Sequence, residues 1–291
     1  MSSLRILQAV IPDTEGGIST LETALLVARD FAAHVQVLHV RPDPAQAVPL
    51  VGEAMSGAMV DEMIRLCETR GREQSNRVHA LFDSLVTRYS LPIVEEPPGP
   101  PSVSISFREE TGSEDSIATR LGRLCDLVIA GRPTGEEDPW LEATLNAVLM
   151  DSVRPLLVAP RTPVRQLGKS VAIAWNNSPE AVRAIHASLP FLLKAETITV
   201  LVADEGHADA ATRDLEHWLS WHGLAIKTRQ IKPTGLTGNA VGGALLEAAS
   251  QEQADLLVMG AFTHSRLRQL ILGGVTRHVL DHATIPLLLC H

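Results

Sequence analysis

Two spacings of hydrophobic residues alternate along the second half of the chain. Short aliphatic and β-branched runs, typical of buried strands, are separated by segments in which apolar residues recur every three or four positions, as in amphipathic helices. The expected strands are VAIAW (171–175), TITVLVAD (197–204), LAIKTRQIK (224–232), ADLLVMGA (254–261) and IPLLLC (285–290). Helices are expected at 179–194, 209–223, 238–254 and 265–283. Such alternation predicts a mostly parallel sheet covered by helices on both faces.

The first half follows the same plan. Its expected strands are LRILQAVI (4–11), HVQVLHVR (34–41), SVSISF (102–107), CDLVIAG (125–131) and RPLLVAP (154–160), and a long helical segment lies within 44–89. Its closing strand, helix and strand match those of the second half almost in register, which indicates a tandem duplication. We therefore expect an α/β chain of two tandem Rossmann-like doubly wound domains, each with a five-stranded, mostly parallel sheet. The domains are expected at 1–160 and 169–291, with a polar linker containing proline and glycine between them.

Composition narrows the classes of function. The 291 residues carry a net charge of -9 and contain 45% hydrophobic and 20% charged residues. An acidic balance argues against nucleic acid and anionic membranes as partners, because both attract basic surfaces. We see no secretory signal and no membrane span, and three scattered cysteines do not form a disulfide framework. A reducing, cytoplasmic compartment is expected.

The stretch DLLVMGAFTHSRLRQLILGGVTRHVL (255–280) carries the strongest indication of chemistry. Gly260 directly follows an apolar strand, and Gly273 and Gly274 stand thirteen and fourteen positions later. A glycine at the carboxyl end of a parallel strand lets a ligand approach the backbone, and the N–H groups of a following helix start attract anions. Alternatively, Gly260 only ends a strand and the glycine pair is a helix break or a tight packing point. Glycine motifs are frequent by accident, so from the spacing alone both interpretations stay open.

Both halves resemble the universal stress protein family. The resemblance rests on VMGA, HSRLRQLILGGVTRHVL and IPLLL, together with AWNNSPEA near the start of the second half. The family signature has a glycine, a second glycine three positions on, and after nine residues a glycine and a serine or threonine. The corresponding positions here are Gly260, Thr263, Gly273 and Gly274, so Thr263 and Gly274 depart from the signature.

The resemblance implies a site for an adenine nucleotide, ATP with Mg²⁺, in the second half. The residues that it places there are Ala174, Asn176, Val202, Met259, Gly260, Thr263, Ser265, Arg266, Gly273, Gly274, Val275 and Thr276. Asn176 stands where the family often has an aspartate, and its amide can still donate and accept hydrogen bonds. Alternatively, Asn176, Asn177 and Ser178 form a turn and cap the helix that opens at Pro179.

The same site is expected to be degenerate in the first half. Gly135 lies four positions after Gly131 rather than three, and Glu136, Glu137 and Asp138 would repel phosphates. Asp13 matches the family's aspartate, although an isolated aspartate beside glycines is usually a turn residue. We expect this half to serve structure or partner binding.

Other combinations of reactive side chains are weaker. His217 and His222 are five positions apart, a spacing that turns two helical side chains away from each other, and no metal site is expected. Cys125 and Cys290 indicate buried thiols. His278 and His282 share one helix face. Two further residues, Trp218 and Trp221, are expected to pack a helix against the sheet or the other half.

The resemblance therefore implies a stress-adaptation module that senses a nucleotide, with at most slow ATPase activity and no identifiable catalytic residue. A nucleotide-free interaction protein of the same fold is the main alternative, and an enzyme acting on a small ligand between the domains is a more remote one. The family often pairs the last strand antiparallel across a dimer, so this chain is expected to form that pairing internally, with further homodimerisation through other surfaces. No protein partner can be named.

Overall fold

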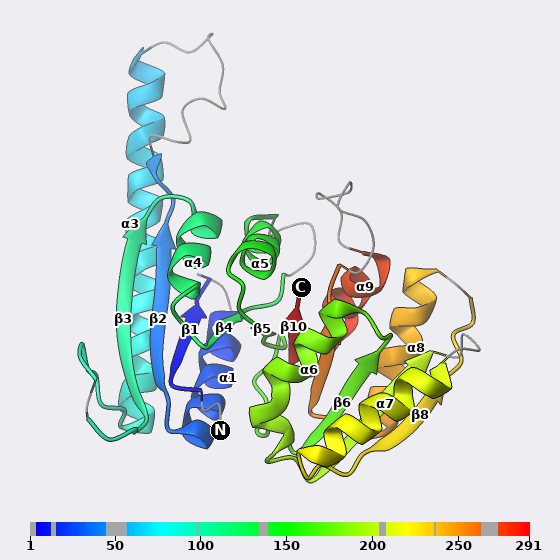
Figure 1. The fold of residues 1–291 in the computed structure, drawn as a ribbon. Helices are drawn as coiled ribbons and strands as arrows, with labels where there is room; N and C mark the ends of the chain where they lie inside the picture. Colours follow the sequence, from blue (N-terminus) through cyan, green and yellow to red (C-terminus); the bar gives the residue numbers. More distant parts are fainter. Residues whose placement is uncertain are drawn as a thin grey trace.

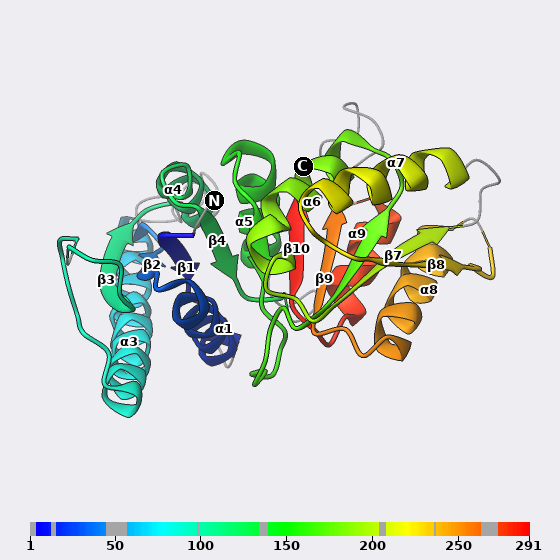
Figure 2. The ribbon, with the colours of Figure 1, turned by 60° about the horizontal axis from the view of Figure 1, so that its bottom comes forward.

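The structure, a computed structural model, describes residues 4–12, 16–44, 57–97, 99–133, 139–203, 208–235, 237–262 and 273–291. Its ten strands form one sheet in the order β3-β2-β1-β4-β5-β10-β9-β6-β7-β8 (Figures 1 and 2). In the first half the strands are β1 (Ile6–Val10), β2 (His34–Arg41), β3 (Ser104–Thr111), β4 (Leu127–Ala130) and β5 (Leu156–Val158). In the second half they are β6 (Ser170–Trp175), β7 (Thr197–Ala203), β8 (Lys227–Ile231), β9 (Leu256–Gly260) and β10 (Leu287–Cys290).

Helices cover both faces of this sheet. They are α1 (Gly16–Phe31), α3 (Gly57–Tyr89), α4 (Glu114–Gly122), α5 (Pro139–Asp151), α6 (Pro179–Leu192), α7 (Ala208–Trp221), α8 (Gly238–Gln251) and α9 (Gly274–His282). Helices α1, α3, α6 and α7 contribute to one buried apolar cluster, while α4, α5, α8 and α9 contribute to the other. Each cluster contains residues of both halves, so the two sheet faces carry one core each. Helix α3 extends well past the ends of its neighbouring strands (Figure 1).

The two halves meet through their last strands. Strand β10 pairs antiparallel with β5, with Leu287 opposite Val158 and Leu289 opposite Leu156, whereas every other ladder between the named strands is parallel. This confirms the internal antiparallel pairing expected from the family. The pairing joins the five strands of each half into one continuous sheet. The main-chain groups at the edges of β5 and β10 hydrogen-bond to each other, so neither apolar strand edge is exposed.

An aspartate anchors the first strand of each half in the same way. The Asp126 carboxylate accepts hydrogen bonds from the main-chain N–H groups of Arg5 and Ile6, at 2.6 and 3.0 Å. The Asp255 carboxylate accepts from the N–H groups of residues 168–170 at 2.8 to 3.2 Å. Since both aspartates immediately precede an inner strand, the local geometry at the start of each sheet half is the same.

Several element boundaries follow directly from local sequence chemistry. Helix α6 starts at Pro179, as expected, because Ser178 caps it by accepting the Ala181 N–H at 3.1 Å. The helix expected at 265–283 is wrong as one continuous segment. Residues 263–272 lie outside the described residues, and α9 begins only at Gly274 because Gly273 is extended, with ψ of 137°.

The two tryptophans of α7 differ from each other. Trp218 packs against the apolar cluster as expected, with its ring 4.6 Å from that of His186. Trp221 does not pack there, since 79% of it is exposed and its Nε1 donates to His217 Nε2 at 3.1 Å. The prediction for Trp221 was wrong: it is the last residue of α7 and lies on the solvent side of the helix. None of the helices in the described part combines the length and apolar character that crossing a membrane requires.

Candidate functional site

A cavity of about 370 Å³ opens at the carboxyl ends of β6, β7, β8 and β9 in the second half. This is the edge at which doubly wound sheets bind ligands. Eight of the twelve residues predicted for the site line this one cavity: Ala174, Asn176, Met259, Gly260, Gly273, Gly274, Val275 and Thr276. The structure therefore brings together residues that lie 102 positions apart (276 minus 174).

The other four predicted residues have different outcomes. Val202 is 4% exposed and packs in the apolar cluster on the opposite sheet face, while its neighbours Leu201 and Ala203 line the cavity. Side chains alternate along a strand, so the Val202 side chain faces away from the cavity. The contact that the resemblance implies for Val202 would be made by its main-chain groups and stays a prediction. Thr263, Ser265 and Arg266 lie outside the described residues, as do Asp13 and the acidic residues 136–138 of the first half.

Two helix N-termini meet at this cavity. The first residue of α8, Gly238, lies so close to the first turn of α9 that a Cβ there would stand 2.5 Å from the carbonyl carbon of Gly274. No side chain caps α9 at Gly273, so among the described residues no side-chain acceptor is seen for the first N–H groups of the helix. The positive ends of two helix dipoles and these N–H groups make the cavity suited to an anionic ligand.

Gly260 has a packing role that its sequence position did not reveal. A Cβ at this residue would lie 2.5 Å from the Ala181 main-chain nitrogen and 2.7 Å from the Glu180 carbonyl carbon. The end of β9 therefore touches the first turn of α6, and glycine is required for that contact. Gly273 differs from Gly260 because nothing lies within 4 Å of its ideal Cβ.

Asn176 lines the cavity and also forms the turn that the sequence allowed as an alternative. Its Oδ1 accepts the Ser178 main-chain N–H at 3.2 Å, and this turn leads into the Ser178 cap of α6. Because Oδ1 is used in this way, the Nδ2 hydrogens are the donors that the side chain can offer to a ligand in the cavity. The next residue, Asn177, has a φ of 57°, which asparagine tolerates better than most residues.

Apolar residues from β6, β7, β8 and α8, and from the segment after β9, complete the cavity. They are Trp175, Leu201, Ala203, Ile231, Val241, Leu245 and Phe262. Phe262 has a φ of 64°, an unusual conformation for a bulky residue and one that is often found at functional sites. No titratable side chain belongs to the described lining, which suits binding of a flat apolar ring and an anionic group better than proton transfer.

In the first half the equivalent position is filled differently. Gly131 directly follows β4, at the position that corresponds to Gly260 at the end of β9, but the next residue is the buried Arg132, only 4% exposed. Its Nη2 donates to the Ile285 carbonyl oxygen at 3.1 Å, across the junction of the halves. Burial, with a smaller contribution from Arg161, lowers the pKa of Arg132 to about 10. A buried guanidinium that links the halves fits the structural role expected for this part of the chain.

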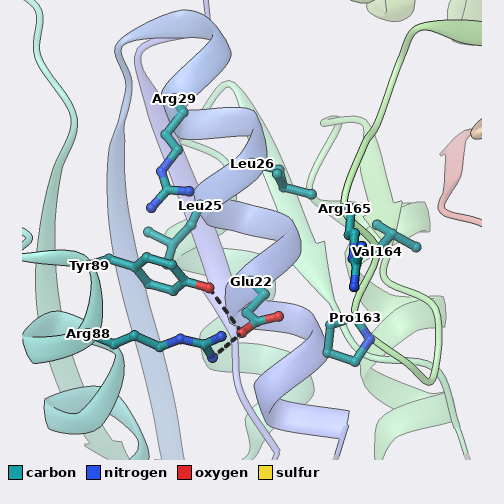
Figure 3. A pocket seen from close by; sticks show the side chains of 9 residues that line it. All are labelled: Glu22, Leu25, Leu26, Arg29, Arg88, Tyr89, Pro163, Val164 and Arg165. Carbon is teal, nitrogen blue, oxygen red and sulfur yellow. Dashed lines mark hydrogen bonds and ion pairs between the residues drawn. The ribbon is translucent and has the colours of Figure 1, made fainter.

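A second concave surface lies between α1, the end of α3 and residues 163–165 (Figure 3). The Glu22 carboxylate accepts hydrogen bonds from Arg88 at 3.1 Å and from the Tyr89 hydroxyl at 3.2 Å. Arg88 is 64% exposed, and Arg29 and Arg165 are also exposed. Solvent screening weakens ion pairing at such positions, so we do not regard this surface as the functional site.

The remaining predictions concern two cysteines, two histidines and metal binding. Cys125 and Cys290 are buried as expected, and burial raises the pKa of their thiols to about 11 and about 12. His278 and His282 do share one face of α9, with rings stacked at 4.2 Å, and His278 packs on Gly242 of α8. Among the residues that the structure describes, no cluster of side chains suited to a metal ion was found.

Comparison with known proteins places this geometry in context. A model of the universal stress protein family matches residues 169–291. A universal stress protein from Archaeoglobus fulgidus DSM 4304 is similar in structure, with a TM-score of 0.64 and 16% identity over 98% of this chain and 97% of that one. A putative universal stress protein from Pseudomonas aeruginosa UCBPP-PA14 has a TM-score of 0.56 and 16% identity over 99% and 93%.

A functionally unknown protein from Pseudomonas aeruginosa PAO1 is similar as well, with a TM-score of 0.57 and 17% identity over 99% and 92% of the two chains. No curated protein matches the sequence significantly. At these identities the solved structures show the fold, and they show it over the whole chain rather than over one half.

Proposed function

Because residues 169–291 form a universal stress protein domain, we propose that the cavity of this half binds an adenine nucleotide and that the chain acts as a nucleotide-regulated stress-adaptation module. The observation that carries the proposal is the convergence of the uncapped α9 start, the α8 start and eight predicted residues on one cavity. Its volume of about 370 Å³ lies within the range of small-ligand sites.

Each part of the cavity suits one part of the nucleotide. The N–H groups of residues 274–276 would bind phosphate oxygens, since a helix start stabilises negative charge. The apolar surface of Ile231 and Phe262 would cover the base, and the Nδ2 group of Asn176 would donate to the ribose or the base. The described lining offers no carboxylate for Mg²⁺, so the metal would depend on the phosphates themselves.

The same lining supports binding rather than efficient catalysis. No described side chain in the cavity can act as a general base. Nucleotide hydrolysis, if measured, is therefore expected to be slow, and bound nucleotide would act through the conformation of the protein.

Substitution of Gly273 tests the proposal directly. Because nothing lies within 4 Å of its ideal Cβ, Gly273→Glu adds a negative charge at the start of α9 without steric conflict. We expect wild-type protein, stripped of any co-purified nucleotide, to bind ATP with Mg²⁺ in isothermal titration calorimetry. Gly273→Glu should weaken that binding at least about tenfold, since the charge opposes phosphate at a helix start.

The neutral variant Gly273→Gln is the matched control, because it has the same size without the charge. It should retain binding within a few fold. If wild-type protein binds no adenine nucleotide and carries none through purification, the chain belongs to the alternative class of nucleotide-free interaction proteins. If both variants lose binding equally, charge at the α9 start is not what holds the ligand.

A further inference from the structure

The two halves can be compared residue by residue through their strand pairing. Ile6 is paired with His34 as Ser170 is paired with Thr197, and the next pairs follow in step. The same registers place Arg108 of β3 where β8 has Arg229. They also place Arg123, four residues before β4, where Glu252 stands before β9.

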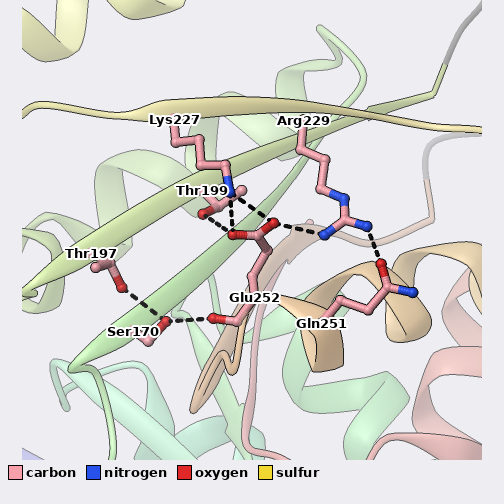
Figure 4. A network of polar contacts seen from close by, with 7 residues as sticks. All are labelled: Ser170, Thr197, Thr199, Lys227, Arg229, Gln251 and Glu252. Atoms are coloured by element: carbon pink, nitrogen blue, oxygen red, sulfur yellow. Dashed lines mark hydrogen bonds and ion pairs between the residues drawn. The ribbon is translucent and has the colours of Figure 1, made fainter.

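In the second half, Glu252 fills the space over the amino ends of the strands (Figure 4). Its carboxylate pairs with Lys227 at 2.8 Å and with Arg229 at 2.7 Å, and its main-chain oxygen accepts from the Ser170 hydroxyl at 3.2 Å. Only 15% of the Glu252 side chain is exposed. The chain thus supplies its own carboxylate to this face of the sheet.

The first half lacks that carboxylate. Arg123 occupies the corresponding position, is exposed, and donates from Nε to the Asp151 carbonyl oxygen at 3.2 Å. A cavity of about 570 Å³ lies over the amino ends of β1, β2 and β3 instead. This cavity adjoins the first residues of its strands, whereas the proposed nucleotide cavity adjoins the last residues of its strands. The two cavities therefore lie at opposite ends of the strands.

The floor of this cavity is an ordered set of uncharged hydrogen-bonding groups. The two ring nitrogens of His34 lie 2.9 Å from the hydroxyls of Ser104 and Ser106. The two serines are 1% and 9% exposed, so this arrangement is built into the sheet. Burial lowers the pKa of His34, which keeps the imidazole neutral near pH 7, with one nitrogen donating and the other accepting.

The walls of the cavity carry charges of both signs. Arg5 and Arg108 supply two guanidinium groups, of which Arg108 is already paired with Glu110 and Arg5 has no side-chain acceptor among the described residues. Glu95 and Glu96, on the loop before β3, supply two carboxylates. These glutamates would repel a simple anion, whereas a ligand with both charges would find a partner for each.

We propose that this cavity binds a small zwitterion of the amino-acid class, whose carboxylate takes the place that Glu252 holds in the second half. The ligand carboxylate pairs with Arg5 and Arg108, and its ammonium group with the Glu95 and Glu96 carboxylates. The His34 and serine floor hydrogen-bonds its polar side chain. This site does not depend on the nucleotide cavity, so the two proposals stand or fall separately.

Titration of the full-length chain with each of the twenty amino acids by isothermal calorimetry tests the inference. At least one should bind saturably, while acetate and methylamine, which carry one charge each, should bind at least about tenfold more weakly. Acetate that binds as tightly as the best amino acid would overturn the assignment to zwitterions. Absence of binding by all twenty would overturn the site itself.

Arg123→Glu is the decisive variant, because it places in the first half the carboxylate that the second half already has. It should compete internally with the ligand and reduce affinity at least about tenfold. Arg120→Glu is the matched control, since Arg120 is exposed on α4 and makes the same charge change. Neither arginine lines the cavity, but only position 123 corresponds to Glu252 in the strand register. Equal affinity of both variants would contradict the proposal.

A second variant covers the case in which Arg123→Glu fails to fold, as judged by circular dichroism. Arg108→Gln removes one of the two guanidinium groups from a side chain that is 41% exposed, so folding should tolerate it. Amino-acid affinity should fall about tenfold, whereas ATP binding should not change. Unchanged amino-acid affinity in Arg108→Gln would overturn the proposed ligand orientation.

Discussion

At the level of single residues, the space around a glycine decides whether the fold tolerates a side chain at that position. Gly260 touches the α6 backbone, whereas Gly273, which belongs to the same sequence signature, has open space around it. Glycine spacing treats the two as equivalent. Only the packing distinguishes a glycine that the fold requires from one that a ligand site can use.

The Glu252 ion pairs predict an acid-sensitive contribution to stability. Hydrogen bonds from Lys227 and then Arg229 lower the pKa of Glu252 below its ordinary value of 4.5. A carboxyl group whose pKa is lower in the folded state stabilises the protein above the unfolded pKa, and that stability is lost as pH falls through the folded value. Wild-type protein should therefore exceed Glu252→Gln in stability at pH 7.

The difference should shrink steadily below about pH 4.5, which urea denaturation at several pH values measures. Glu247→Gln on the same helix is the control, because Glu247 is exposed and its carboxylate accepts from Gln251 rather than from a cation. A difference for Glu252→Gln that stays constant from pH 7 to pH 3 would show that the ion pairs contribute nothing.

At the level of elements, the contact between α8 and α9 shapes the cavity proposed to bind a nucleotide. Gly238 meets the α9 backbone, and Gly242 lies against the His278 ring, with an ideal Cβ 2.8 Å from one ring carbon. A serine at Gly274, as the family signature has, would bring its Cβ within 3.2 Å of the Gly238 Cα. The departure at Gly274 therefore accompanies a close helix contact.

Paired substitutions in α8 separate this contact from helix propensity. Gly238→Ala should destabilise the protein by about 1–3 kcal/mol and disturb nucleotide binding, because its Cβ would meet backbone that cannot move aside. Gly243→Ala, whose nearest neighbour is the His278 Nε2 at 3.6 Å, should stabilise it by up to about 1 kcal/mol. Thermal and urea unfolding measure both, and equal effects would show that the contact between Gly238 and α9 is not tight.

The spacing of residues in the sequence predicted the helices and strands better than it predicted the contacts between them. Strand β2 has the predicted bounds, and the Ser178 and Pro179 pair fixed the start of α6, because periodicity and capping are local. Ile231 and Leu245 line the cavity, yet an apolar residue in a strand or helix indicates only a core position. The placement of Ile231 depends on where β8 ends in the sheet, and that of Leu245 depends on how α8 packs on α9; no local pattern encodes either.

At the level of the whole molecule, the antiparallel β5 and β10 pair determines how the halves associate. Residues 169–291 expressed alone would leave the β10 edge, LLLC, unpaired and apolar. An exposed edge of this kind pairs readily with another chain. We expect this fragment to form a dimer in sedimentation velocity experiments at micromolar concentration.

The full chain, measured beside the fragment, shows whether the pairing is responsible. Its β10 edge is already covered by β5, so any association must use other surfaces. A fragment that remains monomeric throughout the same concentration range would contradict this interpretation of the pairing between β5 and β10.

The antiparallel pairing of β5 with β10 also affects how the protein could evolve. In a dimer of identical subunits joined in this way, every mutation appears on both sides of the twofold axis at once. Here the two sides are separate stretches of one gene, so Glu252 and Arg123 could diverge at matching positions without affecting each other. One polypeptide can in this way carry different side chains, and so different chemistry, at matching positions of its two halves.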